Sequence, residues 1–274
     1  MATEIKPPIK YDMVWTMYGK RADFFGIAER FHIDPVTARV IRNRDVITDE
    51  EIDTYLNGGL DRLHDPVMMK NMEKGCSLML EEIRNRNRIR IISDYDVDGV
   101  SSNYILYKGL QRVWEHENGS PAGASIDYDI PHRIYDGYGI NIRMVDAAAA
   151  DQVSMIITCD NGIAAFDVVR KAKEYGMRVI VTDHHDIPYD TDENDIRVYK
   201  VPEADAVIDH KQPGCEYPCK ELCGAGVAYK FIQLLYRMCG IPEAECETFI
   251  EILGIATVCD VMNLVDENRI IVRE

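Results

Sequence analysis

Five short apolar runs, each rich in β-branched residues, recur between residues 88 and 209 and constrain the fold more than any other feature of the sequence. They read RIRIIS, IDYDIP, MIITC, RVIVT and AVID and begin at residues 88, 126, 155, 178 and 206. Segments with helical periodicity separate most of these runs. Strands that alternate with helices form a mostly parallel sheet with helices on both faces. We therefore expect an α/β fold over residues 89–274.

The preceding residues, 1–88, carry helix signals and no strand pattern. Asp34-Pro35 is an N-cap followed by proline at the first helical position. Thr48 and Glu51 have the spacing of a capping box, and Asp65-Pro66 repeats the first signal. We expect residues 1–88 to form a helical N-terminal segment.

The charge balance limits what the surface as a whole can bind. With 31 basic and 47 acidic residues, the 274-residue chain has a formal net charge of −16. Such a surface repels nucleic-acid backbones, which excludes a general nucleic-acid coat protein but leaves room for a local site where metal cations reverse the field. The sequence shows neither the apolar core of a signal peptide nor a membrane-spanning apolar run, so we expect a cytoplasmic protein with no membrane segment.

The eight cysteines are expected to be reduced thiols. Cys215, Cys219 and Cys223 follow a C-x3-C-x3-C spacing with His210 nearby, whereas structural zinc sites usually contain C-x2-C pairs. A metal role for these thiols stays open as the weaker alternative to buried or unused side chains.

Acidic and histidine residues follow the apolar runs. Ligands bind at the carboxyl ends of the strands in a parallel α/β sheet, so these positions are candidates for chemistry. They are Asp94, Asp96 and Asp98 of DYDVDG, Asp160 of DNG, Asp183, His184 and His185 of DHH, the pair Asp209 and His210, and Asp260 after a further apolar run. If the backbone of DYDVDG is extended, its three aspartates share one side.

This set of residues predicts a metal centre, because crowded carboxylates repel one another and raise each other's pKa. A calcium EF-hand is excluded, since the twelfth position of that loop must be Glu and is Ile105 here. Histidine beside carboxylates favours Mn²⁺, with Mg²⁺ as a substitute. So many ligands indicate two ions that share a carboxylate, the arrangement that activates water for hydrolysis of phosphate esters.

As a set, the motifs resemble those of RecJ-type single-stranded-DNA-specific exonucleases, within the DHH phosphoesterase superfamily. The superfamily motifs are DYDVDG (94–99), DNG (160–162), DHH (183–185) and CGAGVA (223–228). IPHRIYDGYGIN (130–141), ATVCDVMNLVDENRIIV (256–272) and the helical lead-in resemble RecJ specifically. The resemblance covers nearly the whole chain, corresponds to the N-terminal catalytic region of those enzymes, and implies that residues 89–274 are a DHH phosphoesterase domain.

The resemblance implies two Mn²⁺ sites with Asp160 as the shared ligand and a catalytic residue. One ion would be held by Asp96 and Asp160, with Asp94 close by, and the other by Asp98, Asp160, His184 and Asp260.

The resemblance also implies contacts with the substrate. His185 would face the scissile phosphate, while Asp183 would orient a histidine. Arg133 would clamp a phosphate through its guanidinium. Gly224 and Gly226 open a helix whose N–H groups would meet phosphate, or else they permit close packing. Asp209-His210 replaces the asparagine-proline usual in RecJ, which leaves the role of both residues open.

The function expected from this resemblance is metal-dependent hydrolysis of single-stranded DNA from the 5′ end, by a monomer that works beside repair or replication proteins. Two alternatives stay open. The acidic surface favours a phosphodiesterase for short oligonucleotides or cyclic dinucleotides. A non-catalytic DHH scaffold is disfavoured because every expected acid and histidine is present. A pyrophosphatase of the superfamily is disfavoured because Ile92 stands where that family carries histidine.

Overall fold

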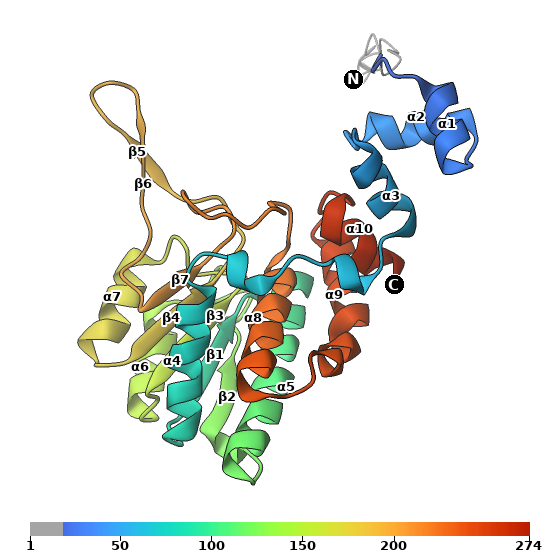
Figure 1. The fold of residues 1–274 in the computed structure, drawn as a ribbon. Coiled ribbons are helices and arrows are strands. Elements are labelled where there is room, and N and C mark those ends of the chain that lie inside the picture. Colours follow the sequence, from blue (N-terminus) through green and yellow to red (C-terminus); the bar gives the residue numbers. More distant parts are fainter. Residues whose placement is uncertain (1–18) are drawn as a thin grey trace, which may run out of the picture. The chain divides into compact units, whose positions relative to one another are not determined.

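The computed structural model describes residues 19–274, so the start of the predicted helical segment, residues 1–18, lies outside the described residues. The chain divides into two compact units between Asp53 and Thr54. The elements of each unit are labelled in Figure 1.

The first unit contains α1 (Phe24–Phe31), α2 (Pro35–Asn43) and the start of α3 (Asp49–Asn57). Asp34 caps α2 as predicted, since its Oδ1 accepts hydrogen bonds from the N–H groups of Val36 and Thr37 at 2.8 and 3.0 Å. The predicted capping box is also formed. The Glu51 N–H donates to Thr48 Oγ1 at 3.1 Å, and the Thr48 N–H donates to Glu51 Oε2 at 2.8 Å.

The second unit is built on a five-stranded sheet in the order β2-β1-β3-β4-β7 (Figure 1). The strands are β1 (Ile89–Ser93), β2 (Ile126–Asp129), β3 (Met155–Cys159), β4 (Arg178–Thr182) and β7 (Ala206–Ile208). Each pair of neighbours is parallel. All five coincide with the predicted apolar runs, so the predicted α/β fold is confirmed.

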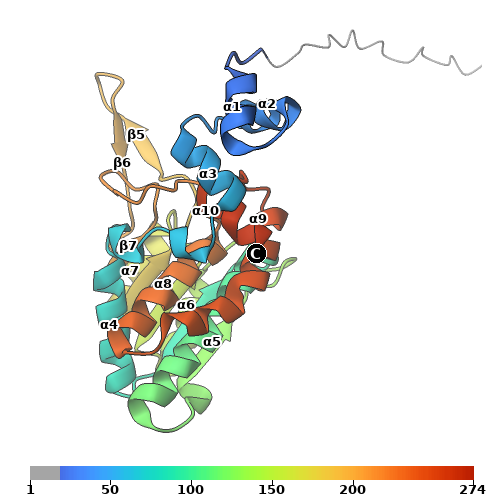
Figure 2. The same ribbon diagram turned by 45° about the vertical axis from the view of Figure 1, so that its right-hand side comes forward.

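Helices cover both faces of this sheet. They are α4 (Met72–Arg84), α5 (Val97–Asn118), α6 (Ile142–Ala150), α7 (Phe166–Glu174) and α8 (Gly224–Cys239). Two further helices do not cover the sheet: α9 (Ile250–Cys259) packs against α5 and α8, and α10 (Asp266–Arg273) packs against α9. Because successive side chains of a strand point to opposite faces, Ile91 packs with α4, α5 and α8, whereas Ile92 packs with α6 and α7. On the first face, α8 lies between α4 and α5 (Figure 2).

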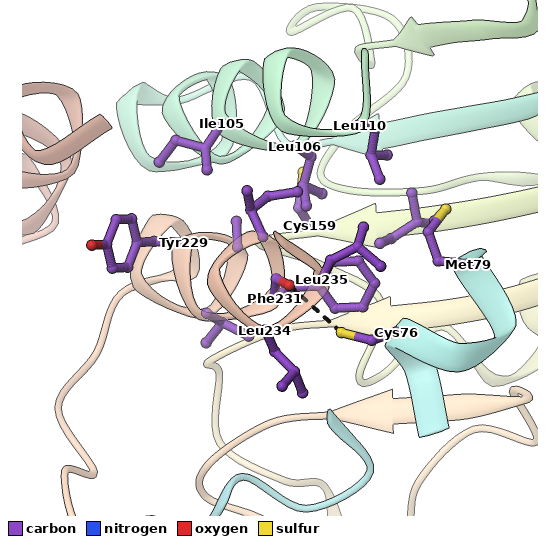
Figure 3. Packing of buried hydrophobic residues seen from close by; sticks show 14 of the residues in the cluster. Cys76, Met79, Ile105, Leu106, Leu110, Cys159, Tyr229, Phe231, Leu234 and Leu235 are labelled. Atoms are coloured by element: carbon purple, nitrogen blue, oxygen red, sulfur yellow. Dashed lines mark hydrogen bonds between the residues drawn. The ribbon is translucent and has the colours of Figure 1, made fainter. Parts of the chain in front are cut away.

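The larger core lies where α8 meets its neighbouring helices. Phe231 and Leu235 of α8 lie close to Leu106 of α5 and to α4 (Figure 3). The Cys76 thiol of α4 donates to the backbone carbonyl of Phe231 at 3.5 Å. This packing fixes the N-terminus of α8 against the carboxyl edge of the sheet, where the candidate site lies.

Residues 54–88 belong to the second unit, because α4 packs against both β7 and α8. Residue 88 therefore marks the start of the sheet, whereas the two compact units divide between Asp53 and Thr54. A domain boundary at residue 88 stays a prediction. Asp65-Pro66 starts only the short 3-10 turn Pro66–Met68, and α4 begins six residues later at Met72. The cap-plus-proline signal was correct for a turn but misplaced the helix.

A two-stranded hairpin, β5 (Tyr189–Thr191) paired with β6 (Arg197–Tyr199), was not predicted. In sequence it lies between β4 and β7, and it projects away from the sheet of the second unit (Figure 1). Its strands have three residues each and are exposed, so they lack the apolar runs that identified the other strands. Among residues 19–274, no helix is both long enough and apolar enough to span a membrane.

Candidate metal centre

The DYDVDG motif forms the turn between β1 and α5. The strand ends at Ser93 and the helix begins at Val97, so DYDVDG is not one extended segment: Asp96 has an extended backbone, but Asp98 is helical. Asp94 follows the strand directly and is buried. Asp96 is the N-cap of α5, where its Oδ1 accepts the Gly99 N–H at 2.9 Å, and Asp98 lies in the first helical turn. The turn, rather than strand alternation, brings the three carboxylates to one edge.

Asp98 is held by the N-terminus of α8. Its Oδ2 accepts the Gly224 N–H at 2.6 Å and its Oδ1 accepts the Ala225 N–H at 2.8 Å. The positive end of the helix dipole favours a carboxylate at this position. These bonds fix the orientation of Asp98 in a site where it is 2% exposed.

The same bonds correct the prediction that Gly224 and Gly226 bind phosphate. The Gly224 N–H is already donated to Asp98, and the Gly226 N–H donates to the Cys223 carbonyl at 2.9 Å. A Cβ at Gly224 would lie 2.7 Å from the Cβ of Asp160, which is too close for two carbon atoms. The close-packing alternative therefore explains Gly224.

The DNG motif turns sharply after β3. Asp160 adopts φ +60°, a left-handed conformation that Asp and Asn enter more readily than other non-glycine residues. Asn161 fixes the turn, because its Nδ2 donates to the carbonyls of Ile92 and Cys159 and its Oδ1 accepts the Ile140 N–H. This structural role of Asn161 was not predicted, although its motif was.

The DHH motif follows β4 and contributes two histidines with different surroundings. His184 is 6% exposed, and its Nε2 lies 3.0 Å from Oδ1 of Asp160, 3.5 Å from Oδ2 of Asp98 and 3.7 Å from Oδ2 of Asp260. Asp260 reaches the site from the C-terminus of α9 rather than from a strand. One imidazole nitrogen thus faces three carboxylates that come from three different elements.

His185 contacts Asp183 through Nδ1, whereas His184 faces its carboxylates through Nε2. Nδ1 of His185 lies 2.7 Å from Oδ1 of Asp183, which also accepts the N–H groups of His184 and His185. The hydrogen bond to Asp183, opposed by burial, raises the pKa of His185 to about 9. The side chain of His185 is 52% exposed, so the ring remains accessible at the edge of the centre. The expected role of Asp183 in orienting a histidine fits this geometry.

Within residues 19–274, the candidate ligands form three overlapping groups whose donor atoms lie within 4.8 Å of one another. They are Asp94 with Asp96 and Asp160, Asp98 with His184 and Asp260, and Asp160 with His184 and His185. The first group is one of the two ligand sets implied by the resemblance. The second group contains Asp98, His184 and Asp260 of the other implied set but not Asp160, which joins His184 in the third group. Carboxylate oxygens with one or two imidazoles suit Mn²⁺ or Mg²⁺.

The electrostatics of these groups fit bound cations. Burial, followed by the charge of Asp98, raises the pKa of Asp160 far above its ordinary value. Burial also raises the pKa of Asp94 and Asp260. Asp94 Oδ2 and His184 Nδ1 are buried and find no hydrogen-bond partner in the described part of the chain. A divalent cation would offset both the repulsion between the carboxylates and the cost of their desolvation. Asp94 Oδ2, which accepts no hydrogen bond from the described residues, is free to act as a metal ligand.

A cavity of about 440 Å³, the edge cavity, opens beside these groups. Asp160, Asp183, His185 and Tyr138 are among the residues that line it. Burial and the charge of Asp96 raise the pKa of Tyr138 to about 12, so the protonated hydroxyl donates to Asp96 Oδ2 at 3.2 Å. Tyr138 was not predicted as a site residue, although it lies in the quoted stretch 130–141.

Arg133 lies outside the ligand groups. It is exposed, and its Cζ lies 5.4 Å from the ring centroid of Tyr95. That ring packs against Tyr138 with 4.8 Å between centroids. Arg133 is therefore connected to Tyr138, which lines the edge cavity, through the ring of Tyr95.

The remaining candidates do not join the centre. Asp209 is buried and accepts the Lys211 N–H at 2.7 Å, but it belongs to none of the ligand groups found among residues 19–274. The same is true of His210, and of the cysteines Cys215, Cys219 and Cys223, which are free thiols.

Comparison with known proteins identifies the class to which this fold and site belong. A family model described as "DHH family, N-terminal domain" matches residues 88–257, more than half of the chain. The chain belongs to the DHH family. Within it, the chain is 34% identical over 245 residues to the single-stranded-DNA-specific exonuclease RecJ of Bacillus subtilis, an alignment that covers 89% of this chain and 28% of that protein.

Solved structures agree with this family. Exonuclease RecJ bound to manganese superposes with a TM-score of 0.61 at 29% identity, covering 75% of this chain and 47% of that one. RecJ of Thermus thermophilus in complex with Mn²⁺ shares the fold with a TM-score of 0.68 at 24% identity, covering 91% of this chain and 32% of that one. The chain thus spans less than half the length of these relatives.

Proposed function

We propose that this chain is the catalytic region of a metal-dependent exonuclease that hydrolyses single-stranded DNA from the 5′ end. The observation that carries the proposal is the convergence of two ligand groups, Asp94/Asp96/Asp160 and Asp98/His184/Asp260, at one sheet edge. The names of the RecJ relatives support the choice of substrate. The metals are proposed to be two Mn²⁺ ions, with Mg²⁺ as a substitute. When bound, they would activate water and neutralise the charge that develops on the phosphate.

The protein's own groups would do the rest. Asp160 would hold both ions, and the α8 N–H groups would keep Asp98 in its binding orientation. His185 would bind an oxygen of the scissile phosphate through Nε2, because Nδ1 is engaged by Asp183. Tyr95 and Tyr138 offer ring faces at the mouth of the edge cavity, where an unstacked base can lie. Arg133 would pair with a neighbouring phosphate.

A second candidate is a phosphodiesterase for short oligonucleotides or cyclic dinucleotides. The net charge of −16 favours it, since a long strand needs many cationic contacts and a dinucleotide needs few. We further propose that the protein acts in the cytoplasm as a monomer in DNA repair or recombination, beside repair or replication proteins.

Product analysis with Mn²⁺ tests the proposal. The purified chain is incubated with matched single-stranded DNA, duplex DNA, a cyclic dinucleotide and pyrophosphate. With the single strand labelled at the 5′ end, the label is expected to appear first in mononucleotide; labelled at the 3′ end, it is expected to remain longest in the shortened strand. Cleavage confined to the dinucleotide would support the second candidate. The absence of both turnover and bound Mn²⁺ would instead support a scaffold.

A further inference from the structure

A second cavity, of about 450 Å³, lies at the base of the β5–β6 hairpin, and none of the metal-ligand groups lines it. We name it the hairpin cavity. Its lining combines three cationic side chains, two aromatic rings and one carboxylate, which are Arg197, Lys211, Lys220, Tyr189, Tyr199 and Asp186. In a chain with a net charge of −16, this excess of cations around one cavity is a local reversal of the overall field.

The hairpin geometry explains how the aromatic and cationic groups come together. Tyr189 pairs with Tyr199 and Thr191 pairs with Arg197, so the four side chains share one face of the ribbon. The tyrosine ring centroids lie 5.8 Å apart. The Cζ of Arg197 lies 4.4 Å from the centroid of Tyr189, a cation–π contact that holds the guanidinium over the ring.

The two lysines reach the cavity from the segment that follows β7. Lys211 Nζ lies 3.1 Å from Asp186 Oδ1. Lys220 Nζ donates to the carbonyls of His210 and Cys215, which fixes its position without neutralising its charge. Positive charge beside exposed tyrosine rings is the combination that binds a nucleotide, because the cations pair with phosphate and the rings stack on the base.

The hairpin cavity adjoins the metal centre. Asp186 lines both the hairpin cavity and the edge cavity, and it directly follows His185. A strand with its end at the metal centre can therefore pass Asp186 and enter the hairpin cavity. We propose that the hairpin cavity is a subsite for one nucleotide of the bound single strand, with its phosphate near Arg197 and Lys211 and its base on Tyr189. This inference rests on the proposed function in its choice of ligand.

Strand binding tests it directly. Fluorescence anisotropy is measured with a labelled thymidylate strand of about twelve nucleotides and with a labelled dinucleotide, in Ca²⁺, and strand integrity is checked by electrophoresis. Arg197→Gln and Tyr189→Ala are each expected to raise the Kd for the longer strand roughly 10-fold, as expected for the loss of one stacked base or one phosphate pair. Their Kd for the dinucleotide should stay unchanged. Arg197→Gln should also reduce the slope of log Kd against log salt by about 0.7.

Two control variants isolate the subsite. Tyr189→Phe keeps the ring and should bind like the wild type, and Lys108→Gln makes the same charge change on α5 at an exposed position that lines neither cavity. Wild-type affinity in both Arg197→Gln and Tyr189→Ala would overturn the inference. So would equal weakening by Lys108→Gln, or no binding of the longer strand by the wild type. If the strand binds as expected but is not cut in Mn²⁺, the proposed function fails while the subsite stands.

Discussion

Oδ1 of Asp160 and Nε2 of His184 lie 3.0 Å apart at the carboxyl edge of the sheet. Asp160 also shares a ligand group with Asp94 and Asp96, while His184 shares one with Asp98 and Asp260. This pair therefore joins the two halves of the centre. Asp160 can occupy this position because its backbone is left-handed and because Gly224, which packs against it, has no Cβ.

Asp160→Ala is expected to abolish hydrolysis while the fold is retained, because it removes the shared ligand. Circular dichroism and a Mn²⁺-dependent assay on a 5′-labelled strand measure the two properties. Asp167→Ala makes the same chemical change at a carboxylate of α7 that is 85% exposed, and it should keep full activity. Turnover retained by Asp160→Ala would contradict the assignment of this residue.

Removal of metal is expected to destabilise the wild type. At a Mn²⁺ concentration about 100 times its Kd, binding adds about 2.7 kcal/mol to the free energy of unfolding, which corresponds to a rise in Tm of about 5–10 °C. Asp160→Ala should lose this Mn²⁺-dependent rise in Tm, because it removes the shared ligand. Differential scanning calorimetry in EDTA and in Mn²⁺ makes the comparison. Equal Tm values for the wild type in both buffers would refute a metal centre.

The two histidines should separate metal binding from catalysis. His185→Gln is expected to lower kcat by about 100-fold while Mn²⁺ content stays near that of the wild type, because Asp183 engages Nδ1 of the ring and Nε2 is proposed to bind the substrate phosphate. His184→Gln should lose Mn²⁺, since its ring faces three carboxylates. Elemental analysis after desalting gives the metal content. If His185→Gln loses as much Mn²⁺ as His184→Gln, His185 is a ligand.

Gly224→Ala should disturb the centre from outside the ligand set. Its Cβ would lie 2.7 Å from Cβ and 3.0 Å from Cα of Asp160, so the turn at Asp160 or the start of α8 must shift. We expect a destabilisation of about 1–3 kcal/mol and a loss of activity of roughly 100-fold. Gly226→Ala is the matched control, because its Cβ would meet the side chain of Leu222 at 3.1 Å. Urea unfolding and the exonuclease assay should show the smaller effect for Gly226→Ala.

Most of the sheet could be predicted from the sequence because β1, β3, β4 and β7 are almost entirely buried and therefore mainly apolar, whereas the edge strand β2 is partly exposed. The face of a helix was harder to predict. The spacing of Val100, Tyr104, Tyr107, Leu110 and Trp114 places them on one helix face, and Leu110 and Trp114 are buried as expected, but Val100 and Tyr104 are 46% and 49% exposed. The buried face also contains Ile105 and Leu106, which belong to the same core as α8. Which apolar side chains of α5 are buried depends on packing against α8, and the periodicity of the sequence alone does not show it.

The metal ligands could be predicted from residue type and from position after each strand, because parallel strands bring their carboxyl ends to one edge. The sequence did not predict how the α8 N–H groups and the tyrosines near the centre are oriented around these ligands. The sequence left Gly224 and Gly226 between phosphate binding and close packing, because it does not show that the carboxylate at the N-terminus of α8 is Asp98 of the protein itself. Tyr138 depends on a contact with the distant Asp96, which a single sequence does not reveal. The hairpin tyrosines lie on short, exposed strands that carry no apolar signal.

A pH-dependent ion pair lies away from the centre. Nε2 of His64 is 2.9 Å from Oδ2 of Asp266 in α10, and this hydrogen bond, opposed by burial, raises the pKa of His64. A raised pKa in the folded state means that the pair contributes its full stability below the ordinary value of about 6.5 and loses it as the pH rises through the raised value. His64→Gln should therefore lower Tm by about 2–4 °C near pH 6, a value discounted because the pair is partly exposed.

The difference between the wild type and His64→Gln should then shrink towards zero as the pH rises. Thermal unfolding in EDTA across this range keeps metal binding out of the comparison. His116→Gln removes an exposed imidazole on α5 and serves as the control. A difference for His64→Gln that stayed constant with pH would mean that His64 stabilises the protein through packing, and that its charge contributes nothing.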